Sequence, residues 1–510
     1  MCGLLFVKAR EGIDRELVAA ALQKQKWRGP DAEGVQQFGD VFLAHQRLSV
    51  LDLSHAADQP MTSRCGHYTI VFNGEIYNHN ELRRRLGLTC RTGCDTETIV
   101  EGFASYGTDI FDLLDGMFAL VVVDTRSGEW WAARDRFGIK PLFIYESGGT
   151  VVLSSETLSI RALVPCTVSS DAIEEWKLIR RPVPGYTYFT EICEVLPGAI
   201  LHNGRTVGRL SIAPRLQGVA DFDQAALETL LTESVRDHEL SDVNNVCLLS
   251  GGIDSSIITA LSTAHRAYTV GLPHNNEFDA AAETAAQLGK ELVKVEVSEQ
   301  ALMESWRALI SLRGEPLSVP NEGLIYMVCK AMQPSEKVVL TGEGADELFF
   351  GYDRIFRSAA IEDAPFTRDD FYRQYCYALN PNRAPRLVSL IDDLWRDKSN
   401  IEFVEDFFLA VHLPGLLRRM DGASMAASKE ARVPFVAMQL AHYMYRRPVT
   451  TKIDAHASKI PLRRFAEHLN LHGALNRPKI GFSSTINKQA GRNDEYSFFQ
   501  NYNLEVLGWL

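Results

Sequence analysis

The sequence predicts an α/β protein of two domains: stacked antiparallel sheets with helices on their faces, followed by a parallel sheet with a helical C-terminal part. Three observations support this prediction. The chain has 510 residues, against about 100–200 residues for an average domain. Short apolar runs separated by turn signals fill residues 1–200, and strand-like and helical segments alternate after residue 223. Hydrophobic residues make up 46% of the chain and charged residues 23%, which excludes a disordered protein.

In the N-terminal domain, several apolar runs have the length and the flanking turn signals of strands. These runs are 41–44, 68–72, 118–123, 129–133 and 151–153. Helical patterns cover residues 13–24, 81–86 and 96–106. Many strands with few helices between them predict sheets that pack face to face, with the helices on the outer faces. The turn Leu196-Pro197-Gly198 and the irregular segment 205–219 mark the end of this domain.

Beyond residue 223 the pattern changes to regular alternation. Helices are predicted at 225–240, 255–264, 279–288 and 299–312, and strands at 245–249, 267–271, 292–297 and 337–341. Strands that alternate with helices in this way form a parallel sheet with crossover helices. Beyond residue 366 the pattern is mostly helical.

Charge and cysteine content narrow the function classes. Lys and Arg number 53 and Asp and Glu number 65, so the formal charge of −12 excludes an overall basic surface for nucleic acid. No apolar run approaches the ~18 residues of a membrane span, and the N-terminal residues lack the order of a secretory signal. Nine cysteines without a Cys-x-x-Cys pair argue against a disulfide framework and a structural zinc site. We therefore expect a cytoplasmic enzyme with no nucleic-acid or membrane partner.

Cys2 becomes the first residue if the initiator methionine is removed. An N-terminal cysteine carries a nucleophile and a base together, because its α-amine, with a pKa near ~7.7–8.0, can accept the thiol proton. The apolar run 4–7 would place Cys2 at the mouth of a buried strand. A cysteine at position 2 is also common without any function, so other residues must decide.

Further residues suit a pocket for glutamine. Asn73 and the backbone N–H of Gly74 could stabilise an oxyanion. Arg47 could pair with the carboxylate of the amino acid, and Glu75 and Asp95 with its ammonium group. The Asn-Gly pair by itself most often forms a hairpin turn, and that alternative stays open.

Six motifs together resemble the glutaminase domain of class II amidotransferases. They are Met1-Cys2-Gly3, Arg28-Gly29-Pro30-Asp31, His45-Gln46-Arg47-Leu48-Ser49, the segment 72–78, Gly93-Cys94-Asp95-Thr96-Glu97 and the segment 134–142. The resemblance implies an Ntn-hydrolase αββα sandwich over residues 2–204, with Cys2 as nucleophile and Asn73 and Gly74 as oxyanion hole. It also implies a glutamine site made of Arg47, Leu48, Ser49, Val50, Leu51, Asn73, Gly74, Glu75 and Asp95.

A loop rich in glycine and serine follows the predicted strand 245–249. Its sequence is Ser250-Gly251-Gly252-Ile253-Asp254-Ser255-Ser256, and a helical pattern comes next. Glycines let the backbone approach phosphate, a helix start offers free N–H groups, and the serine hydroxyls add donors. The loop lacks the lysine of ordinary phosphate loops. It resembles the pyrophosphate loop of ATP pyrophosphatases, which release pyrophosphate and leave an adenylate.

Acidic residues follow two strands of the predicted parallel sheet. Asp254 would lie beside phosphates, which favours an intervening Mg²⁺. The segment 341–347, which contains Asp346, follows the strand 337–341. Because ligands bind at the carboxyl edge of such sheets, we expect Asp254 and Asp346 to hold the metal together. By itself the second stretch is more typical of a solvated helix start.

The C-terminal motifs resemble the synthetase domain of glutamine-hydrolysing asparagine synthetases. They are the segments 248–256, 270–273, 342–347 with Phe349, Gly351 and Tyr352, 420–435, Lys459-x-x-Leu-Arg and Arg477-x-Lys-x-Gly-Phe. The resemblance implies a doubly wound parallel sheet of the ATP-pyrophosphatase type over residues 223–510, after a linker at 205–222. It implies catalytic roles for Lys459 and Glu343. The lysine would contact the reacting phosphate and balance its charge. It also implies an ATP site made of Leu248, Ser250, Gly251, Gly252, Asp254, Ser255, Ser256, Val270, Thr341 and Gly342.

The sequence departs from this family in places. Val436-Ala437 stands where Leu-Asp is usual, and Phe350-Gly351-Tyr352 where Gly-Gly-Tyr is common. The segment 315–322, near which the family receives its acceptor acid, has no assured match to the aspartate-specific pattern. The sequence therefore leaves the identity of the acceptor open, with aspartate as the default.

The resemblance implies a glutamine-dependent asparagine synthetase that uses ATP and Mg²⁺. Glutamine would be hydrolysed at Cys2, and ammonia would reach an acyl-adenylate of L-aspartate to give an amide, glutamate, AMP and pyrophosphate. A homodimer is one assembly that the resemblance allows. One alternative is amidation of another carboxylate, such as a uronic acid, a peptide or a secondary metabolite. Another is β-lactam closure, but a complete glutamine pocket argues against it. The presence of Cys2 and Asp254 disfavours an inactive regulator, and the lack of Cys-x-x-Cys disfavours sulfur transfer to tRNA.

Overall fold

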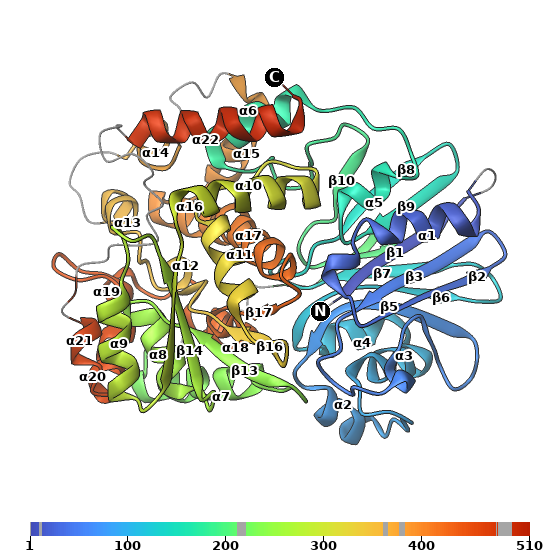
Figure 1. The fold of residues 1–510 in the computed structure, drawn as a ribbon, viewed down its shortest axis with the longest axis horizontal. Helices are drawn as coiled ribbons and strands as arrows, with labels where there is room; N and C mark the ends of the chain where they lie inside the picture. Colours follow the sequence, from blue (N-terminus) through green and yellow to red (C-terminus); the bar gives the residue numbers. More distant parts are fainter. Residues whose placement is uncertain are drawn as a thin grey trace.

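The computed structural model describes residues 2–9, 13–211, 221–360, 366–376, 383–475, 477 and 492–509. Figure 1 shows the N-terminal residues, blue to teal, beside the C-terminal residues, green to red. The last helix, α22 (Arg492–Leu507), runs along the top of this view next to α10 (Glu299–Arg313) and α6 (Ser170–Ile179).

The N-terminal domain contains two six-stranded sheets whose strand pairs are all antiparallel. The first has the order β10-β8-β9-β1-β3-β2 and the second the order β12-β11-β7-β6-β5-β4. The strands of the first are β1 (Cys2–Lys8), β2 (Ala32–Phe38), β3 (Val41–Arg47), β8 (Phe143–Ser147), β9 (Thr150–Ser154) and β10 (Ile192–Glu194). Those of the second are β4 (Met61–Thr62), β5 (Tyr68–Ile76), β6 (Gly116–Asp124), β7 (Trp130–Arg134), β11 (Ala199–His202) and β12 (Arg205–Arg209).

Alternate side chains of β1 point to opposite faces of its sheet, as strand geometry requires. Leu4 and Phe6 join the core between the two sheets, and the Phe6 ring lies 5.0 Å from that of Trp130. Leu5 and Val7 face the helices that cover the first sheet. Those helices are α1 (Arg15–Gln23), α5 (Thr157–Arg161) and α6, and the second sheet is covered by α2 (His79–Leu86), α3 (Asp95–Tyr106) and α4 (Ile110–Leu113). The four layers confirm the predicted αββα sandwich.

The structure tests two sequence-based predictions about this domain. Asn73 and Gly74 lie inside β5 rather than in a hairpin turn. Gly74 is needed there, because a Cβ atom would lie 2.1 Å from the carbonyl oxygen of Met117 on β6. The linker expected at 205–222 is wrong for residues 205–209, which form β12 on β11. β12 is an edge strand with few apolar residues, and its Val207 is exposed, so its sequence carries little strand signal. Residues 212–220 lie outside the described residues.

The C-terminal domain is built on a five-stranded sheet with the order β15-β14-β13-β16-β17, all parallel. The strands are β13 (Asn244–Leu248), β14 (Arg266–Gly271), β15 (Glu291–Glu296), β16 (Glu336–Leu340) and β17 (Glu430–Arg432). The order reverses between β13 and β16, and such a switch point is where ligands bind in these sheets. The alternation in the sequence predicts the first four strands, but β17 is too short and too charged to be recognised.

Helices cover both faces of this sheet, which confirms the doubly wound architecture. One face carries α7 (Gln224–His238), α8 (Ile253–Leu261), α9 (Phe278–Gln287), α18 (Met438–Met444) and α20 (Ile460–His468). The other carries α10, α11 (Glu322–Ala331) and α17 (Leu413–Met425). The remaining helices are α12 (Ala345–Leu348), α13 (Asp353–Ala360), α14 (Arg368–Tyr375), α15 (Pro385–Trp395), α16 (Asn400–Phe407), α19 (Val449–Lys452), α21 (His472–Leu475), a π-helical turn (Phe408–His412) and the short 3₁₀ turns Lys26–Arg28, His55–Ala57, Gly107–Asp109 and Pro434–Val436.

The two domains share apolar contacts. Phe137 and Ile139 of the first domain belong to the core of the second. After α22, the ring of Trp509 packs 5.8 Å from that of Phe189, so the end of the chain rests on the first domain. Among the described residues, no helix has the length and apolar character that crossing a membrane would require.

The central core of the sandwich gives a stability prediction. Phe6 is fully buried, so Phe6→Ala should lower the free energy of unfolding by about 3–5 kcal/mol through lost transfer energy and a cavity. Leu53, which is 55% exposed, provides a control, since Leu53→Ala should change the value by no more than about 0.5 kcal/mol. Urea unfolding measures both, and equal effects of the two variants would contradict this packing.

Candidate active sites

The first candidate site lies where β1 begins. Cys2 pairs in register with Arg47 of β3, and its backbone N–H donates to Asn73 Oδ1 at 2.9 Å. Cys2 is only 6% exposed, and burial raises the pKa of its thiol. A base close to the sulfur is therefore needed to form the thiolate at neutral pH.

Asn73 is fully buried beside Cys2 and is not among the residues that line the cavity at Cys2, whereas Gly74 lines it. With Asn73 Oδ1 turned to Cys2, the amide nitrogen of Asn73 lies 3.4 Å from Ser155 Oγ. The amide nitrogen and the Gly74 N–H are the hydrogen-bond donors that an oxyanion beside the thiol requires. The structure therefore brings the predicted nucleophile and its two predicted oxyanion donors together.

Charged and apolar side chains line this cavity. Its walls include Arg47, Leu48, Val50, Leu51, Gly74, Glu75 and Asp95, together with Cys2. Arg47 also holds the loop that follows β3, by bonds to Ser54 O at 2.8 Å and Asp58 Oδ1 at 2.7 Å. Ser49 does not line the cavity, and its N–H donates instead to Asp31 Oδ2 at 2.7 Å.

Two buried carboxylates meet in the cavity. Burial raises the pKa of Asp95 to about 6, although the N–H groups of Ile76 and Thr96 oppose the shift. Burial and the charge of Asp95 raise the pKa of Glu75, while Arg432 lowers it. Oε1 of Glu75 is buried and has no hydrogen-bond partner among the described residues. An ammonium group is the natural partner for such a pair of acids.

Sequence reasoning missed several residues of this cavity. They are Ala57, Gln59, Phe72, Cys94, Thr96 and Glu430. Gln59 fixes β5, because it accepts from Phe72 N at 2.6 Å and donates to Phe72 O at 3.2 Å. Glu430 comes from β17 of the other domain, and the one available signal was its place in the motif Glu430-Ala431-Arg432-Val433-Pro434-Phe435.

The second candidate site lies at the carboxyl edge of the parallel sheet. The loop after β13 is held by hydroxyl groups: Ser255 Oγ accepts from Ser250 N at 3.0 Å, and Ser250 Oγ accepts from Gly252 N at 3.1 Å. Gly252 is the N-cap of α8. A Cβ on Gly251 would lie 2.8 Å from that of Ala280, so this position must be glycine. The arrangement directs the start of a helix into a cavity of about 400 Å³.

Lys459 lies between the two carboxylates that the sequence predicts to bind metal. Its Nζ is 2.6 Å from Asp254 Oδ2 and 2.6 Å from Asp346 Oδ1. Burial lowers the pKa of Lys459, but the two carboxylates raise it more strongly, so the side chain stays charged. A Cβ on Gly351 would lie 1.9 Å from Asp346 Oδ1, which shows why glycine follows this acidic turn.

The donor set suits Mg²⁺. This ion takes one or two carboxylates together with phosphate oxygens and water, and Asp254 and Asp346 converge on one point beside a phosphate-type loop. No cluster of three or more potential metal ligands occurs within the described ranges. The two carboxylates would thus leave most coordination positions to a nucleotide.

Further charged groups face the nucleotide cavity. Glu343, predicted to be catalytic, lines it and accepts from Arg419 Nη2 at 2.7 Å. Tyr352 Oη donates to Glu347 Oε1 at 2.6 Å and also contacts His412 Nε2 at 3.0 Å. Burial and the charge of Asp346 raise the pKa of Glu347 to about 7.

Most of the predicted ATP residues line this cavity. They are Leu248, Ser250, Gly251, Gly252, Asp254, Ser255, Thr341 and Gly342. Ser256 and Val270 do not: Ser256 Oγ bonds Gly252 O at 2.8 Å, and Val270 packs in the sheet core. Sequence reasoning assigned no role to Ile253, Glu277, Asp353, Met420 or Ser458, which do line it. Of the basic motif at 477–482, Arg477 lines the cavity and the rest lies outside the described residues.

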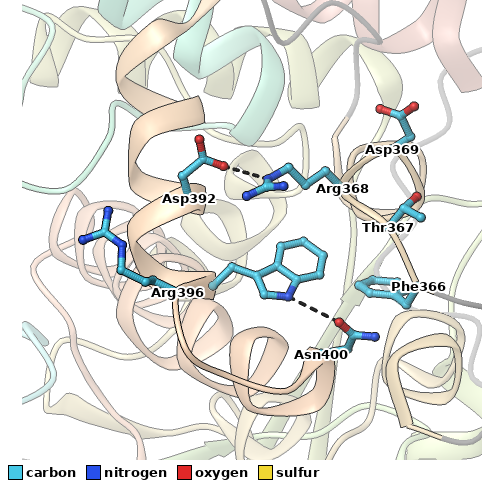
Figure 2. Close-up of a pocket in the computed structure, with 8 residues that line it drawn as sticks. Phe366, Thr367, Arg368, Asp369, Asp392, Arg396 and Asn400 are labelled. Atoms are coloured by element: carbon cyan, nitrogen blue, oxygen red, sulfur yellow. Dashed lines mark hydrogen bonds and ion pairs between the residues drawn. The ribbon is translucent and has the colours of Figure 1, made fainter.

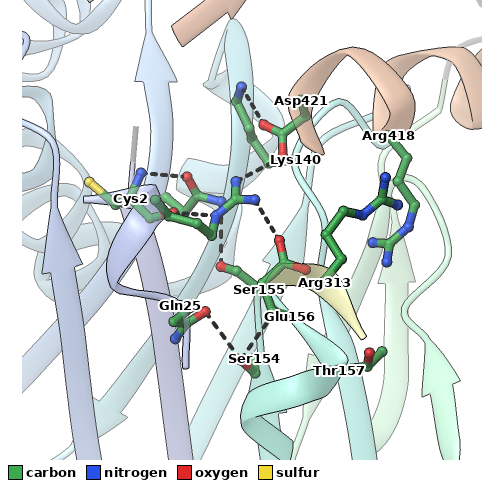
Figure 3. Close-up of polar contacts among 12 residues, drawn as sticks. Cys2, Gln25, Lys140, Ser154, Ser155, Glu156, Thr157, Arg313, Arg418 and Asp421 are labelled. Atoms are coloured by element: carbon green, nitrogen blue, oxygen red, sulfur yellow. Dashed lines mark hydrogen bonds and ion pairs between the residues drawn. The ribbon is translucent and has the colours of Figure 1, made fainter. Parts of the chain in front are cut away.

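A buried polar network links Cys2 to Asp421 at the domain junction (Figure 3). Arg28 Nε donates to Cys2 O at 2.9 Å, and its two terminal nitrogens bond Glu156 at 2.7 Å and Asp421 at 2.8 Å. Lys140 Nζ lies 3.3 Å from the other oxygen of Asp421. Asp421 lies on α17 of the second domain, directly after Met420, which lines the nucleotide cavity.

A third cavity, of about 750 Å³, lies on the helical part of the C-terminal domain (Figure 2). Its walls carry none of the residues predicted for catalysis. Arg368 Nε donates to Asp392 Oδ1 at 2.7 Å, and Trp395 Nε1 donates to Asn400 Oδ1 at 3.3 Å. Its charged groups therefore largely neutralise one another.

Comparison with known proteins identifies the family of each domain. Residues 1–209 match the glutamine amidotransferase domain family, and residues 226–499 match the asparagine synthase family. Glutamine-hydrolysing asparagine synthetase 1 of Bacillus subtilis (strain 168) is 28% identical over 95% of this chain and 87% of its own length. Its namesake from Arabidopsis thaliana is 31% identical over 85% of this chain and 71% of its own length.

Each candidate site thus lies in a domain that matches one of these two families. The chain belongs to the family of glutamine-hydrolysing asparagine synthetases and is a glutamine-dependent amidotransferase ligase.

Proposed function

We propose that the enzyme transfers the amide nitrogen of glutamine to the side-chain carboxylate of L-aspartate, with ATP as the activating substrate. The products are asparagine, glutamate, AMP and pyrophosphate. The observation that carries this proposal is the Arg28 network, which connects the carbonyl of Cys2 to Asp421, next to a residue that lines the nucleotide cavity.

At the first site, the sulfur of Cys2 attacks the side-chain carbonyl carbon of glutamine. The α-amine that is free after removal of Met1 accepts the thiol proton. The oxyanion then faces the amide nitrogen of Asn73 and the N–H of Gly74. Ammonia leaves, and water hydrolyses the thioester to glutamate. Glu75 and Asp95 hold the ammonium group of glutamine, and Arg47 attracts its carboxylate.

Ammonia has to reach the second site without meeting bulk water, because protonation would remove its lone pair. The junction between the sites favours such a passage. Arg28, Lys140 and Asp421 are all at most 3% exposed, and they bond to one another rather than to solvent.

At the second site, a carboxylate oxygen of aspartate attacks the α-phosphorus of ATP, and pyrophosphate leaves. Lys459 offsets the negative charge that develops on phosphorus. Mg²⁺ held by Asp254 and Asp346 would neutralise part of the phosphate charge. Ammonia then attacks the acyl carbon, and AMP departs with the bonding electrons of the acyl–oxygen bond.

The proposal predicts that aspartate stimulates pyrophosphate release with either glutamine or ammonium as nitrogen source. In Cys2→Ala the glutamine-dependent reaction should be lost, while the ammonium-dependent reaction stays within about threefold, since the two sites lie in different domains. A coupled pyrophosphate assay with chromatography of the amide measures both. Stimulation by other carboxylic acids but not by aspartate would refute the acceptor, and equal loss of both reactions would refute the two-site assignment.

The buried acids predict how glutamine binding depends on pH. Burial raises the pKa of Asp95 to about 6, and the ionised form binds the ammonium group. The KM for glutamine should therefore be flat above pH ~7 and rise about tenfold by pH ~5, where most of Asp95 is protonated. Asp95→Asn should show a higher KM with a weaker acid limb, because Glu75, whose pKa burial also raises, still titrates. Steady-state glutaminase assays test both, and a flat KM in the unsubstituted enzyme would contradict the assignment.

A further inference from the structure

We propose that Arg432, on the synthetase domain, is a positioning residue of the glutamine site, where it orients the carboxylate of Glu75 toward the substrate. This inference rests on the proposed function, since it takes the cavity at Cys2 to be the glutamine site. It gives a role to a motif, Glu430-Ala431-Arg432, that the reaction steps above leave without one.

Arg432 and Glu75 form a buried ion pair across the domain junction. Arg432 Nη2 lies 2.9 Å from Glu75 Oε2, and the exposed fractions of the two side chains are 0% and 3%. Oε1 of Glu75 has no hydrogen-bond partner in the described part of the chain. One carboxylate oxygen is therefore fixed by the partner domain, while the other is left for a ligand in the cavity.

The guanidinium of Arg432 is itself held on every side. Its Nε donates to Glu430 Oε1 at 2.6 Å, and its Nη1 donates to His238 O at 2.9 Å and Leu240 O at 2.6 Å. A planar group fixed by several bonds cannot follow a moving carboxylate, so Arg432 determines where Glu75 lies. Lysine, with one nitrogen, cannot reproduce these contacts.

Charge favours the same role. Burial and Asp95 raise the pKa of Glu75, and Arg432 opposes them. Two carboxylates this close are hard to keep ionised together without a buried cation. Loss of the guanidinium would therefore weaken the attraction of Glu75 for an ammonium group as well as its orientation.

The backbone of Arg432 belongs to the nucleotide side. Its carbonyl accepts from Thr341 N at 3.0 Å, and it pairs with Leu340 in the parallel ladder of β16 and β17. Thr341 and Gly342 line the nucleotide cavity. The backbone of Arg432 thus contacts the strand that leads into the ATP site, and its side chain contacts the glutamine site.

A double-substitution cycle on the full-length enzyme tests this role, with Arg432→Gln, Glu75→Gln and both together. The readouts are KM and kcat for glutamine hydrolysis without ATP. We expect Arg432→Gln to raise KM at least about tenfold with kcat changed less than about threefold, because the thiol and its oxyanion donors are untouched. If Arg432 acts through Glu75, the double variant should lie within about twofold of Glu75→Gln.

Arg313→Gln is the matched control. Arg313 forms an equally buried pair with Glu322 at 2.7 Å, with exposed fractions of 4% and 0%, but does not line the glutamine cavity. Its KM for glutamine should stay within about twofold of the unsubstituted enzyme. Circular dichroism identifies variants that fold. If Arg432→Gln does not fold, Arg432→Lys replaces it. Because lysine keeps the charge, the KM for glutamine should also rise in Arg432→Lys, but by a smaller factor.

Three results would overturn the inference: an unchanged KM in Arg432→Gln (or in Arg432→Lys, where that variant replaces it), an equal rise in Arg313→Gln, or effects of Arg432→Gln and Glu75→Gln that simply multiply. Failure of the unsubstituted enzyme to hydrolyse glutamine is a different result. It would refute the proposed function itself, so the two failures are distinguishable.

Discussion

The burial of Arg28 is the interaction on which the two-site arrangement depends. Its guanidinium is fully buried, which would be costly without partners. Burial lowers the pKa of Arg28, but Asp421 and Glu156 raise it, so the charge persists. Since Glu156 lies in the first domain and Asp421 in the second, the cation is satisfied only when both domains are in place. The nucleophile is tied to the same group, because Arg28 also binds the carbonyl of Cys2.

The second site obeys the same rule, that a buried charge needs a partner. Lys459 is balanced by Asp254 and Asp346, which come from the ends of two neighbouring parallel strands. The switch point of the sheet brings these strands together, and glycines at positions 251 and 351 make room for the approach. The same sheet supplies β17, whose Glu430 lines the cavity at Cys2 and whose Arg432 pairs with Glu75 in the wall of that cavity. Sheet topology therefore determines part of the glutaminase site as well as the nucleotide site.

Sequence periodicity predicted both architectures and most of their strands, because apolar alternation and helix–strand order are local signals. Local signals also placed Cys2, Asn73 and Asp95 together through motifs that match a known family. They could not predict that Ser49 and Ser256 use their polar groups within the protein, because such contacts depend on distant segments. Nor could they predict β17: three residues with two charges look exposed, and only ion pairs formed after folding make their burial possible. The identity of the carboxylic acid that accepts the nitrogen likewise cannot be predicted from a local sequence pattern.

The central claim is that ammonia made at Cys2 reaches the acyl-adenylate inside the protein. It is tested most directly by supplying glutamine with ¹⁵N in its side-chain amide, together with a large excess of unlabelled ammonium, aspartate and ATP. If the buried junction around Arg28 and Asp421 carries the ammonia, mass spectrometry of the amide product will show mostly ¹⁵N at early times. Label diluted to the composition of the bulk ammonium pool would contradict the account.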